Sequence, residues 1–271
     1  MKKIFSEEII EKICETIIEI SYKLPEEVKK YIKIAYEKET EKYSKKYLGI
    51  ILKNIEIAEK NKIPICQDTG LPIIFVEIGT NVKIEIGKYR DITEIINIGI
   101  EKGSKKGYLR KSVVSAIERK NTGTNTPGVI HFVLNNSDKL KVTIIAKGFG
   151  SENKSRIKML NPSDGKKGIE NFIIETVKNA GSLPCPPLFI GVGIGGSFEK
   201  AAFLSKYALC KVGKEDSEYR EWEKEILSKI NDLKIGPSGF GGNITVLDLK
   251  IETYPTHIAG LPVAVNLCCW A

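Results

Sequence analysis

The strongest constraint on the fold is a change in the spacing of apolar residues near Pro64. Before it, Ile9, Ile13 and Ile17 recur at the spacing of one helix face. After it, short apolar runs separated by Gly, Pro and Asn are typical of strands and turns, and helix-like stretches intervene. The pattern predicts a mixed α and β fold. A helical N-terminal lobe (residues 1–60) should precede an α/β core (61–271) with mixed or antiparallel sheets, both within a single domain 1–271.

Individual elements follow from the same pattern. Pro25 suits the first turn of a helix that runs toward Tyr36. Further helices are expected over about 40–60, 93–102, 165–180, 198–209 and 215–232, and strands over 72–78, 128–134, 140–147, 188–192 and 244–252. The last strand is expected to be half-buried, since its apolar residues (Leu247, Leu249, Ile251) alternate with charged ones (Asp248, Lys250, Glu252).

Charge and composition exclude several classes of protein. The formal net charge is +8, but Lys alternates with Glu along helix-like stretches, which is typical of solvated helix faces. No basic run is interleaved with aromatic residues, so no nucleic-acid partner is expected. The first 20 residues lack the features of a signal peptide, and no stretch has the roughly 20 apolar residues of a membrane span. We therefore expect a cytoplasmic protein with no membrane partner, whose cysteines are thiols or metal ligands.

The six cysteines have two kinds of surroundings. Cys14 and Cys210 lie in helix-like apolar segments and are expected to be buried core residues. Cys66 and Cys185 lie in proline-containing loops, and Cys268 and Cys269 follow Asn266 at the end of the sequence. No local C-x₂-C pair indicates zinc. Three separated thiols could instead hold a four-iron cluster with one iron left open as a Lewis acid. Cys268 and Cys269 cannot both face one cluster if the segment is extended.

Six stretches, in order, resemble the class I fumarases and L(+)-tartrate dehydratases, a family of iron–sulfur hydro-lyases. They are Cys66-Gln67-Asp68-Thr69-Gly70; Leu109-Arg110 with Ser112-Val113-Val114; Asn121-Thr122-Gly123 with Asn125-Thr126-Pro127; Lys147-Gly148 with Gly150-Ser151-Glu152-Asn153; Cys185-Pro186-Pro187 with the run Gly191–Gly196; and Thr256-His257-Ile258-Ala259 with the run Leu261–Asn266. The similarity covers the chain from about residue 60 onward, and more loosely the helical start.

The resemblance implies a set of ligands and substrate contacts. Cys66, Cys185 and Cys269 would hold a [4Fe-4S] cluster, and Cys268 would be an additional thiol. The implied substrate-binding residues are Gln67, Asp68, Arg110, Gly148, Gly150 and His257, of which Asp68, Arg110 and His257 are also the expected catalytic residues. Substitutions that could reshape the pocket stand at Lys111, Thr124, Phe149 and Trp270, where family members usually have Pro, Asp, Gly and often His.

The same resemblance implies the activity and the partner. The chain would be the α subunit of an enzyme that hydrates or dehydrates a small dicarboxylate, either fumarate/malate or L-tartrate/oxaloacetate. In the two-subunit form of the family, a separate β subunit completes the site, and an α2β2 assembly is expected. Arg110 could clamp a substrate carboxylate with two parallel hydrogen bonds. Asp68 could act as an acid or base, or simply form the turn before Thr69-Gly70.

Two other hypotheses use the same residues. The run Gly191–Gly196 satisfies G-x-G-x-x-G and could serve a nucleotide-dependent oxidoreductase, although the acidic residue required about 20 positions later is not preceded by a strand. The cysteines could also belong to a non-catalytic zinc or assembly protein. Of the two histidines, His131 lies in a strand-like run and is expected to be structural, whereas His257 follows Pro255 in a turn.

Overall fold

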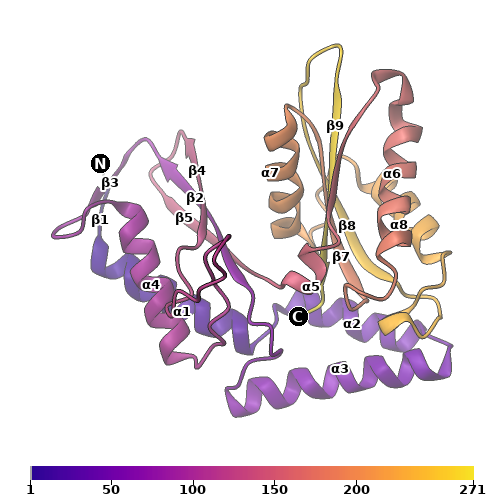
Figure 1. Ribbon diagram of the computed structural model, residues 1–271, viewed down its shortest axis with the longest axis horizontal. Coiled ribbons are helices and arrows are strands. Elements are labelled where there is room, and N and C mark those ends of the chain that lie inside the picture. The colour runs from indigo at the N-terminus through magenta and orange to yellow at the C-terminus, as the bar shows by residue number, and fades with distance from the viewer. Residues whose placement is uncertain (1) are drawn as a thin grey trace. The chain divides into compact units, whose positions relative to one another are not determined.

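The computed structural model describes residues 2–271 (Figure 1), and the chain divides into two compact units. Unit 1 comprises Met1–Leu24 and Ile55–Gly148, and unit 2 comprises Pro25–Asn54 and Phe149–Ala271. Helix α1 (Ser6–Tyr22) thus belongs to unit 1 and helix α2 (Glu26–Lys38) to unit 2. Among residues 2–271, no helix combines the length and apolarity needed to cross a bilayer.

The mixed α and β fold class is confirmed. Unit 1 contains β1 (Lys2–Phe5), α1 (Ser6–Tyr22), β2 (Leu71–Gly79), β3 (Val82–Glu85), α4 (Ile92–Lys106), β4 (Val129–Asn135), β5 (Leu140–Lys147) and the end of α3 (Lys42–Asn61). Its three-stranded sheet has the order β4-β2-β5, with β2 parallel to β4 and antiparallel to β5. A second, two-stranded sheet pairs β1 with β3 in front of the predicted N-terminal helices.

Helices α1 and α4 pack closely and share one apolar core with β2. The core contains the predicted face of α1, including Ile9, Ile13 and Ile17, all at most 5% exposed. The helices approach at Gly99 and Gly103 of α4, one helical turn apart. A Cβ at Gly99 would lie 2.8 Å from the Cβ of Ile13. These glycines thus set the distance between the two helices.

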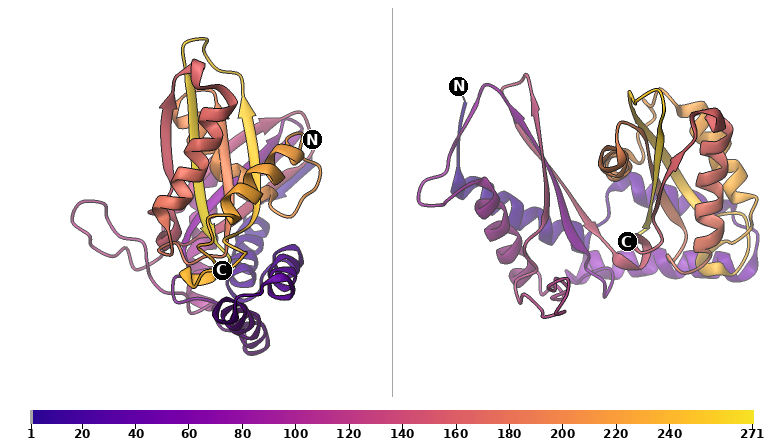
Figure 2. Two further views of the ribbon diagram at one scale, coloured as in Figure 1. Left: turned by 90° about the vertical axis from the view of Figure 1, so that its right-hand side faces the viewer. Right: turned by 45° about the horizontal axis from the view of Figure 1, so that its top comes forward.

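Unit 2 is built around a four-stranded sheet with the order β6-β9-β7-β8 (Figures 1 and 2). Its strands are β6 (Arg156–Leu160), β7 (Leu188–Gly195), β8 (Val246–Tyr254) and β9 (Leu261–Cys269), and its helices are α2 (Glu26–Lys38), α5 (Phe149–Glu152), α6 (Gly165–Ala180), α7 (Phe198–Ala208), α8 (Arg220–Asn231) and most of α3. β7 is parallel to β8 and antiparallel to β9. The predictions of α2, α3, α6 and α7 are confirmed to within a few residues.

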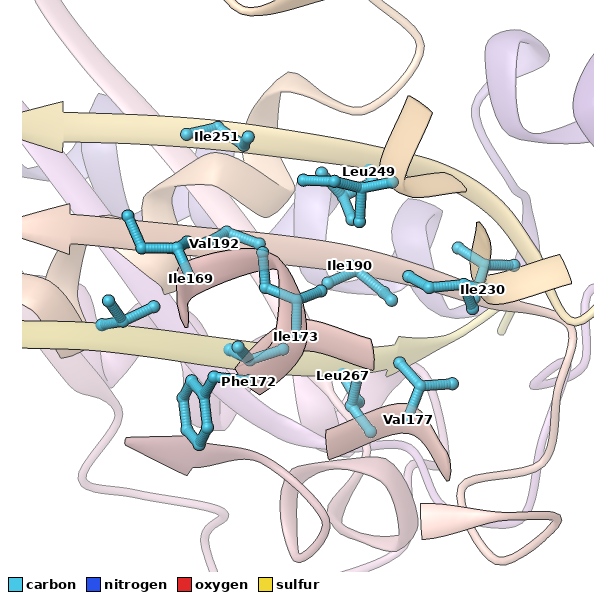
Figure 3. Close-up of a cluster of buried hydrophobic side chains, with 14 of the residues drawn as sticks. Ile169, Phe172, Ile173, Val177, Ile190, Val192, Ile230, Leu249, Ile251 and Leu267 are labelled. Carbon is cyan, nitrogen blue, oxygen red and sulfur yellow. The ribbon is translucent and has the colours of Figure 1, made fainter. Parts of the chain in front are cut away.

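The two faces of this sheet carry different side chains. On one face, Val192 and Leu249 pack against Ile173 of α6 and Ile230 of α8 in the main core (Figure 3). On the other face, β7 presents glycines to α7. A Cβ at Gly193 would lie 2.1 Å from the carbonyl oxygen of Ala201, so the helix backbone rests directly on the strand.

Strand β8 is more deeply buried than predicted. Its charged face should have been solvated, yet Asp248 and Lys250 are at most 2% exposed. Asp248 accepts hydrogen bonds from the Arg220 guanidinium (3.1 Å) and the Gly213 backbone N–H (2.9 Å). The Lys250 ammonium lies 3.5 Å from both Asp248 and Glu223. Alternation in a sequence cannot distinguish such an internal ion-pair network from a face exposed to water.

We predict that Gly193→Ala lowers the free energy of unfolding by roughly 1–3 kcal/mol, because the added methyl overpacks the β7–α7 contact. Gly260→Ala is the matched control, since its Cβ would approach only the Met159 methyl, at 4.0 Å. Thermal unfolding followed by circular dichroism compares the two variants. Equal melting temperatures would show that α7 does not depend on this glycine.

Candidate active site

Unit 1 presents Cys66 on a short loop between α3 and β2. The Asp68 carboxylate accepts a hydrogen bond from the Gly70 backbone N–H (3.1 Å), which closes a tight turn. Gly70 has a φ of +78°, and a Cβ there would lie 2.6 Å from the carbonyl carbon of Ala146 in β5. The loop is therefore held against β5, and both Cys66 and Gln67 are exposed.

Arg110 joins the same loop through its backbone. Its carbonyl oxygen accepts hydrogen bonds from the Thr69 hydroxyl (3.3 Å) and the Asn125 amide (2.9 Å). Asn125 is 3% exposed, has a φ of +59° and also accepts from the Ser112 backbone N–H (2.7 Å). Unit 1 thus ties the backbone of Arg110, whose side chain is exposed, to the Cys66 loop. Asn125 is the buried residue that links them, and sequence reasoning gave it no such role.

Two of the unusual substitutions lie beside this arginine. Lys111 and Thr124 line a cavity of about 410 Å³ whose wall also includes Tyr108 and Asn125. The Thr124 hydroxyl is 2.7 Å from that of Thr126. Thr124 therefore contributes a neutral hydroxyl to the wall of this cavity.

The end of β5 contains an unexpected buried cation. Lys147 is 0% exposed, and its ammonium donates a hydrogen bond to the carbonyl oxygen of Gly148 (3.0 Å). A buried ammonium is costly unless it has polar partners. This contact fixes the peptide of Gly148, which is one of the predicted substrate-lining residues. Phe149, which follows and begins α5, is 45% exposed.

Unit 2 places Cys185 on a rigid loop between α6 and β7. The flanking Pro184 and Pro186 are buried, whereas Cys185 is exposed and has a φ of +58°. Its backbone N–H donates to the carbonyl oxygen of Ser182 (3.1 Å). The loop therefore holds the thiol outward in a backbone conformation that L residues rarely adopt.

The second thiol of unit 2 lies at the same end of the sheet. β9 runs antiparallel to β7, and Cys269 pairs with Leu188, the first residue of β7. Cys185 precedes Leu188 by three residues, so residues 84 positions apart in the sequence meet at one sheet end. Cys268 pairs with Phe189 in the same strand. As expected for an extended segment, its side chain points to the face opposite that of Cys269.

Helix α5 is tied to this end of β9 by a buried polar cluster. The Glu152 carboxylate accepts hydrogen bonds from the Lys206 ammonium (2.6 Å) and the Asn266 amide (3.1 Å). Asn266 is 5% exposed, and its amide oxygen has no hydrogen-bond partner among the described residues. Gly150, a predicted substrate-lining residue, lies within α5. The predicted residues Gly150, Cys185 and Cys269 are thus gathered at one end of the unit.

A glycine-rich segment that the sequence analysis missed packs on the Cys185 loop. Residues 236–242 include Ser238, whose φ is +52°, and its backbone N–H donates to the carbonyl oxygen of Pro186 (2.8 Å). Gly239 lies so near Ser182 that a Cβ would come within 2.5 Å of the serine Cβ. The density of glycines in Gly236–Gly242 was the available signal.

His257 lies at the opposite end of unit 2. It is exposed in the turn between β8 and β9, where its Nδ1 accepts a hydrogen bond from the Ala259 backbone N–H (3.2 Å). Strand β9 separates this turn from Cys269 and spans about 26 Å at the usual rise per residue. Within one copy of unit 2, His257 therefore does not lie with Cys185 and Cys269.

The remaining sequence expectations concern structural residues. Cys14 is 1% exposed, and burial raises the pKa of its thiol, as expected for a core cysteine. His131 lies in β4 with its ring stacked on Phe75 at 5.2 Å, which confirms a sheet histidine. Gly191 and Gly193 lie inside β7 and accommodate α7, so close packing accounts for most of the dinucleotide-like run.

Residues 2–271, which the structure describes, do not form a complete metal site. No group of three His, Cys, Asp or Glu side chains is close enough to hold a metal ion. Cys66 belongs to unit 1, whereas Cys185 and Cys269 belong to unit 2. Two of the three predicted ligands therefore share a sheet end, and the third stands on a separate unit.

Comparison with known proteins identifies the family. The sequence model of the fumarate hydratase (fumerase) family matches residues 10–271. A protein of Methanocaldococcus jannaschii, provisionally named L(+)-tartrate dehydratase subunit alpha, is 43% identical over 96% of this chain and 95% of its own length. The L(+)-tartrate dehydratase subunit alpha of Escherichia coli strain K12 is 31% identical over 93% of this chain and 84% of its own length. The chain belongs to the fumarate hydratase (fumerase) family.

Proposed function

We propose that this chain is the α subunit of an iron–sulfur hydro-lyase that reversibly removes water from a small 2-hydroxy dicarboxylate. The observation that carries the proposal is the pairing of Leu188 with Cys269, which puts Cys269 and Cys185 at one sheet end. Family membership supports the reaction class, and the names of the relatives favour L-tartrate over malate as substrate. We also propose that the reaction takes place in the cytoplasm, where cysteines that serve as cluster ligands stay reduced.

The donor set suits a [4Fe-4S] cluster. Cys66 and Cys185 are exposed thiols on loops fixed by a tight turn and by buried prolines, and thiolates are the usual ligands of such clusters. Asn266 lies on the face of β9 opposite Cys269, and its buried amide oxygen, which has no partner among residues 2–271, could accept a hydrogen bond from a donor other than the cluster. We propose Cys66, Cys185 and Cys269 as the ligands. A cluster with three protein ligands supplies one iron as a Lewis acid for the substrate hydroxyl.

The chain's own residues would bind substrate and move the proton. The Arg110 guanidinium can grip one carboxylate through two parallel hydrogen bonds, independent of pH. The peptides of Gly148 and Gly150 can line the same site, the former fixed by Lys147. Asp68, anchored in its turn by Gly70, can exchange a proton with the departing hydroxyl. Gln67 beside it can orient the substrate by hydrogen bonding.

A partner subunit would complete the site. Both relatives carry the name subunit alpha, which implies a subunit of a second kind in those enzymes. We propose that this chain likewise assembles with a β subunit as α2β2 and that the partner supplies further substrate-binding groups. A non-catalytic zinc protein would use the same thiols, and metal analysis distinguishes the two hypotheses.

We further propose that His257 serves an active site in a second copy of the chain. It lies about 26 Å from Cys269 along β9, too far to act in a site at that end of its own unit. The turn that carries it is also well suited to contact another molecule. Ile258 is 89% exposed, and Phe198 and Tyr254 at the same end are 57% and 54% exposed.

The ligand assignment predicts the metal content of cysteine variants. Cys66→Ser, Cys185→Ser and Cys269→Ser should each lose most of the bound iron and sulfide when the protein is prepared without oxygen, because a serine hydroxyl replaces a thiolate ligand. Cys268→Ser and Cys14→Ser are the matched controls and should retain both. Zinc in place of iron and sulfide, or loss only in Cys268→Ser, would contradict the assignment.

Activity measurements test the roles proposed for Arg110 and for the β subunit. Co-expressed with its β subunit, the chain should dehydrate L-tartrate or hydrate fumarate, whereas the chain alone should turn over poorly. Arg110→Lys should lower kcat/KM by about 10- to 100-fold, because lysine cannot form the two-bond clamp. Arg119→Lys, an exposed arginine nearby in the sequence, is the control. Full activity of Arg110→Lys on both substrates would rule out the clamp.

The second-copy hypothesis predicts complementation. His257→Ala and Cys269→Ser should each be nearly inactive, yet their co-expression should restore roughly a quarter of wild-type turnover. Half of randomly formed pairs are mixed, and each mixed pair has one site with both residues intact. If His257 acted in its own copy, no mixture would recover activity. The two variants, purified separately and then mixed under conditions in which subunits do not exchange, give the baseline activity.

A further inference from the structure

A buried carboxylate far from the cysteines in sequence joins two backbone segments of unit 2. Glu39 is 1% exposed and lies just before α3. One oxygen accepts hydrogen bonds from the backbone N–H groups of Thr40 (2.8 Å) and Glu41 (2.9 Å). The other accepts from those of Asn243 (2.8 Å) and Ile244 (3.2 Å). The carboxylate thus accepts four backbone hydrogen bonds from two segments about 200 residues apart, and the Lys45 ammonium donates to the Glu39 carbonyl oxygen (3.2 Å).

This carboxylate holds the end of the glycine-rich segment 236–242. A Cβ at Gly242, whose φ is +102°, would lie 2.7 Å from the Glu39 oxygen, so the backbone there closes directly on the carboxylate. Within the first turn of α3, the Ser44 hydroxyl donates to the carbonyl oxygen of Gly241 (2.6 Å). The segment is therefore attached to the start of α3 at successive residues.

The same segment supports the loop that carries Cys185. Ser238 donates its backbone N–H to Pro186, and Gly239 packs on Ser182, so the contacts flank the cysteine on both sides. Three residues beyond the segment, the carbonyl oxygen of Thr245 accepts a hydrogen bond from the backbone N–H of Leu188 (3.0 Å). A continuous series of contacts thus runs from Glu39 through residues 236–245 to residues 182–188.

We propose that Glu39 is a positioning residue for Cys185: it locks the glycine-rich segment, which in turn fixes the backbone that presents the thiol. The proposal rests on the proposed function, in which Cys185 is a cluster ligand. Five residues of the segment have positive φ, so little in its own conformation keeps it rigid. A charged acceptor shared by four N–H groups supplies that rigidity.

Amide hydrogen exchange of the cluster-free full-length chain tests the positioning directly. In Glu39→Gln, an amide NH₂ faces one pair of backbone donors, so those two hydrogen bonds are lost. Exchange in peptides covering 182–188 and 236–245 should accelerate at least about tenfold, because the loss of even one of these two hydrogen bonds to a charged group corresponds to that factor. Peptides covering 64–70, around Cys66, should be unchanged.

Glu170→Gln is the matched control. Glu170 is another buried carboxylate of unit 2, but its partners are the side chains of Trp222 (2.9 Å) and Lys229 (2.7 Å). It should leave exchange at 182–188 as in the wild type. Equal exchange in Glu39→Gln and Glu170→Gln would overturn the proposal. If Glu39→Gln does not fold, Gly239→Ala, which pushes the segment off Ser182, must accelerate exchange at 182–188.

A second measurement separates this proposal from the function on which it rests. In the anaerobically prepared complex with the β subunit, Glu39→Gln should reduce iron and sulfide content and alter the electron paramagnetic resonance spectrum of the reduced cluster. Faster exchange at 182–188 with an unchanged cluster would mean that Glu39 positions the loop while Cys185 is not a ligand. In that outcome the positioning stands and the ligand assignment fails.

Discussion

The antiparallel pairing of β9 with β7 is the constraint on which the candidate site depends. Its register sets Cys269 opposite Leu188, at the end of the sheet where the Cys185 loop begins. A shift by one residue would turn Cys268 rather than Cys269 toward that face, because neighbouring strand residues point in opposite directions. The register is itself secured by α7, which rests on Gly191 and Gly193 and leaves room for no other residue.

Both units fix their candidate ligands by backbone geometry more than by side-chain contacts. In unit 1, Gly70 lies against β5 and Asp68 closes the turn that exposes Cys66. In unit 2, a positive φ at Cys185 and the glycine-rich segment beside it have the corresponding role. Such loops lose little conformational entropy when a ligand binds, because they were already ordered when the chain folded.

Much of the fold was predictable from apolar spacing, and the reasons for the failures are physical. Helices such as α6 and strands such as β5 were predicted to the residue because their boundaries carry Gly and Asn signals. The charged face of β8 was misjudged because Asp248 and Lys250 find partners only in the folded chain. The site residues came from resemblance. The roles of Asn125 and Glu39 depend on long-range backbone contacts that no local pattern encodes.

The chain passes between the two units three times, at Leu24/Pro25, Asn54/Ile55 and Gly148/Phe149. No single cleavage can therefore separate the two units from each other. During synthesis, α2 emerges long before β8, the strand of unit 2 against which it packs, so this contact must wait for the last third of the chain. All residues of unit 1 have been synthesised once the chain reaches residue 148, so unit 1 can fold earlier. If synthesis is slow beyond that residue, the apolar face of α2 stays exposed and can bind chaperones.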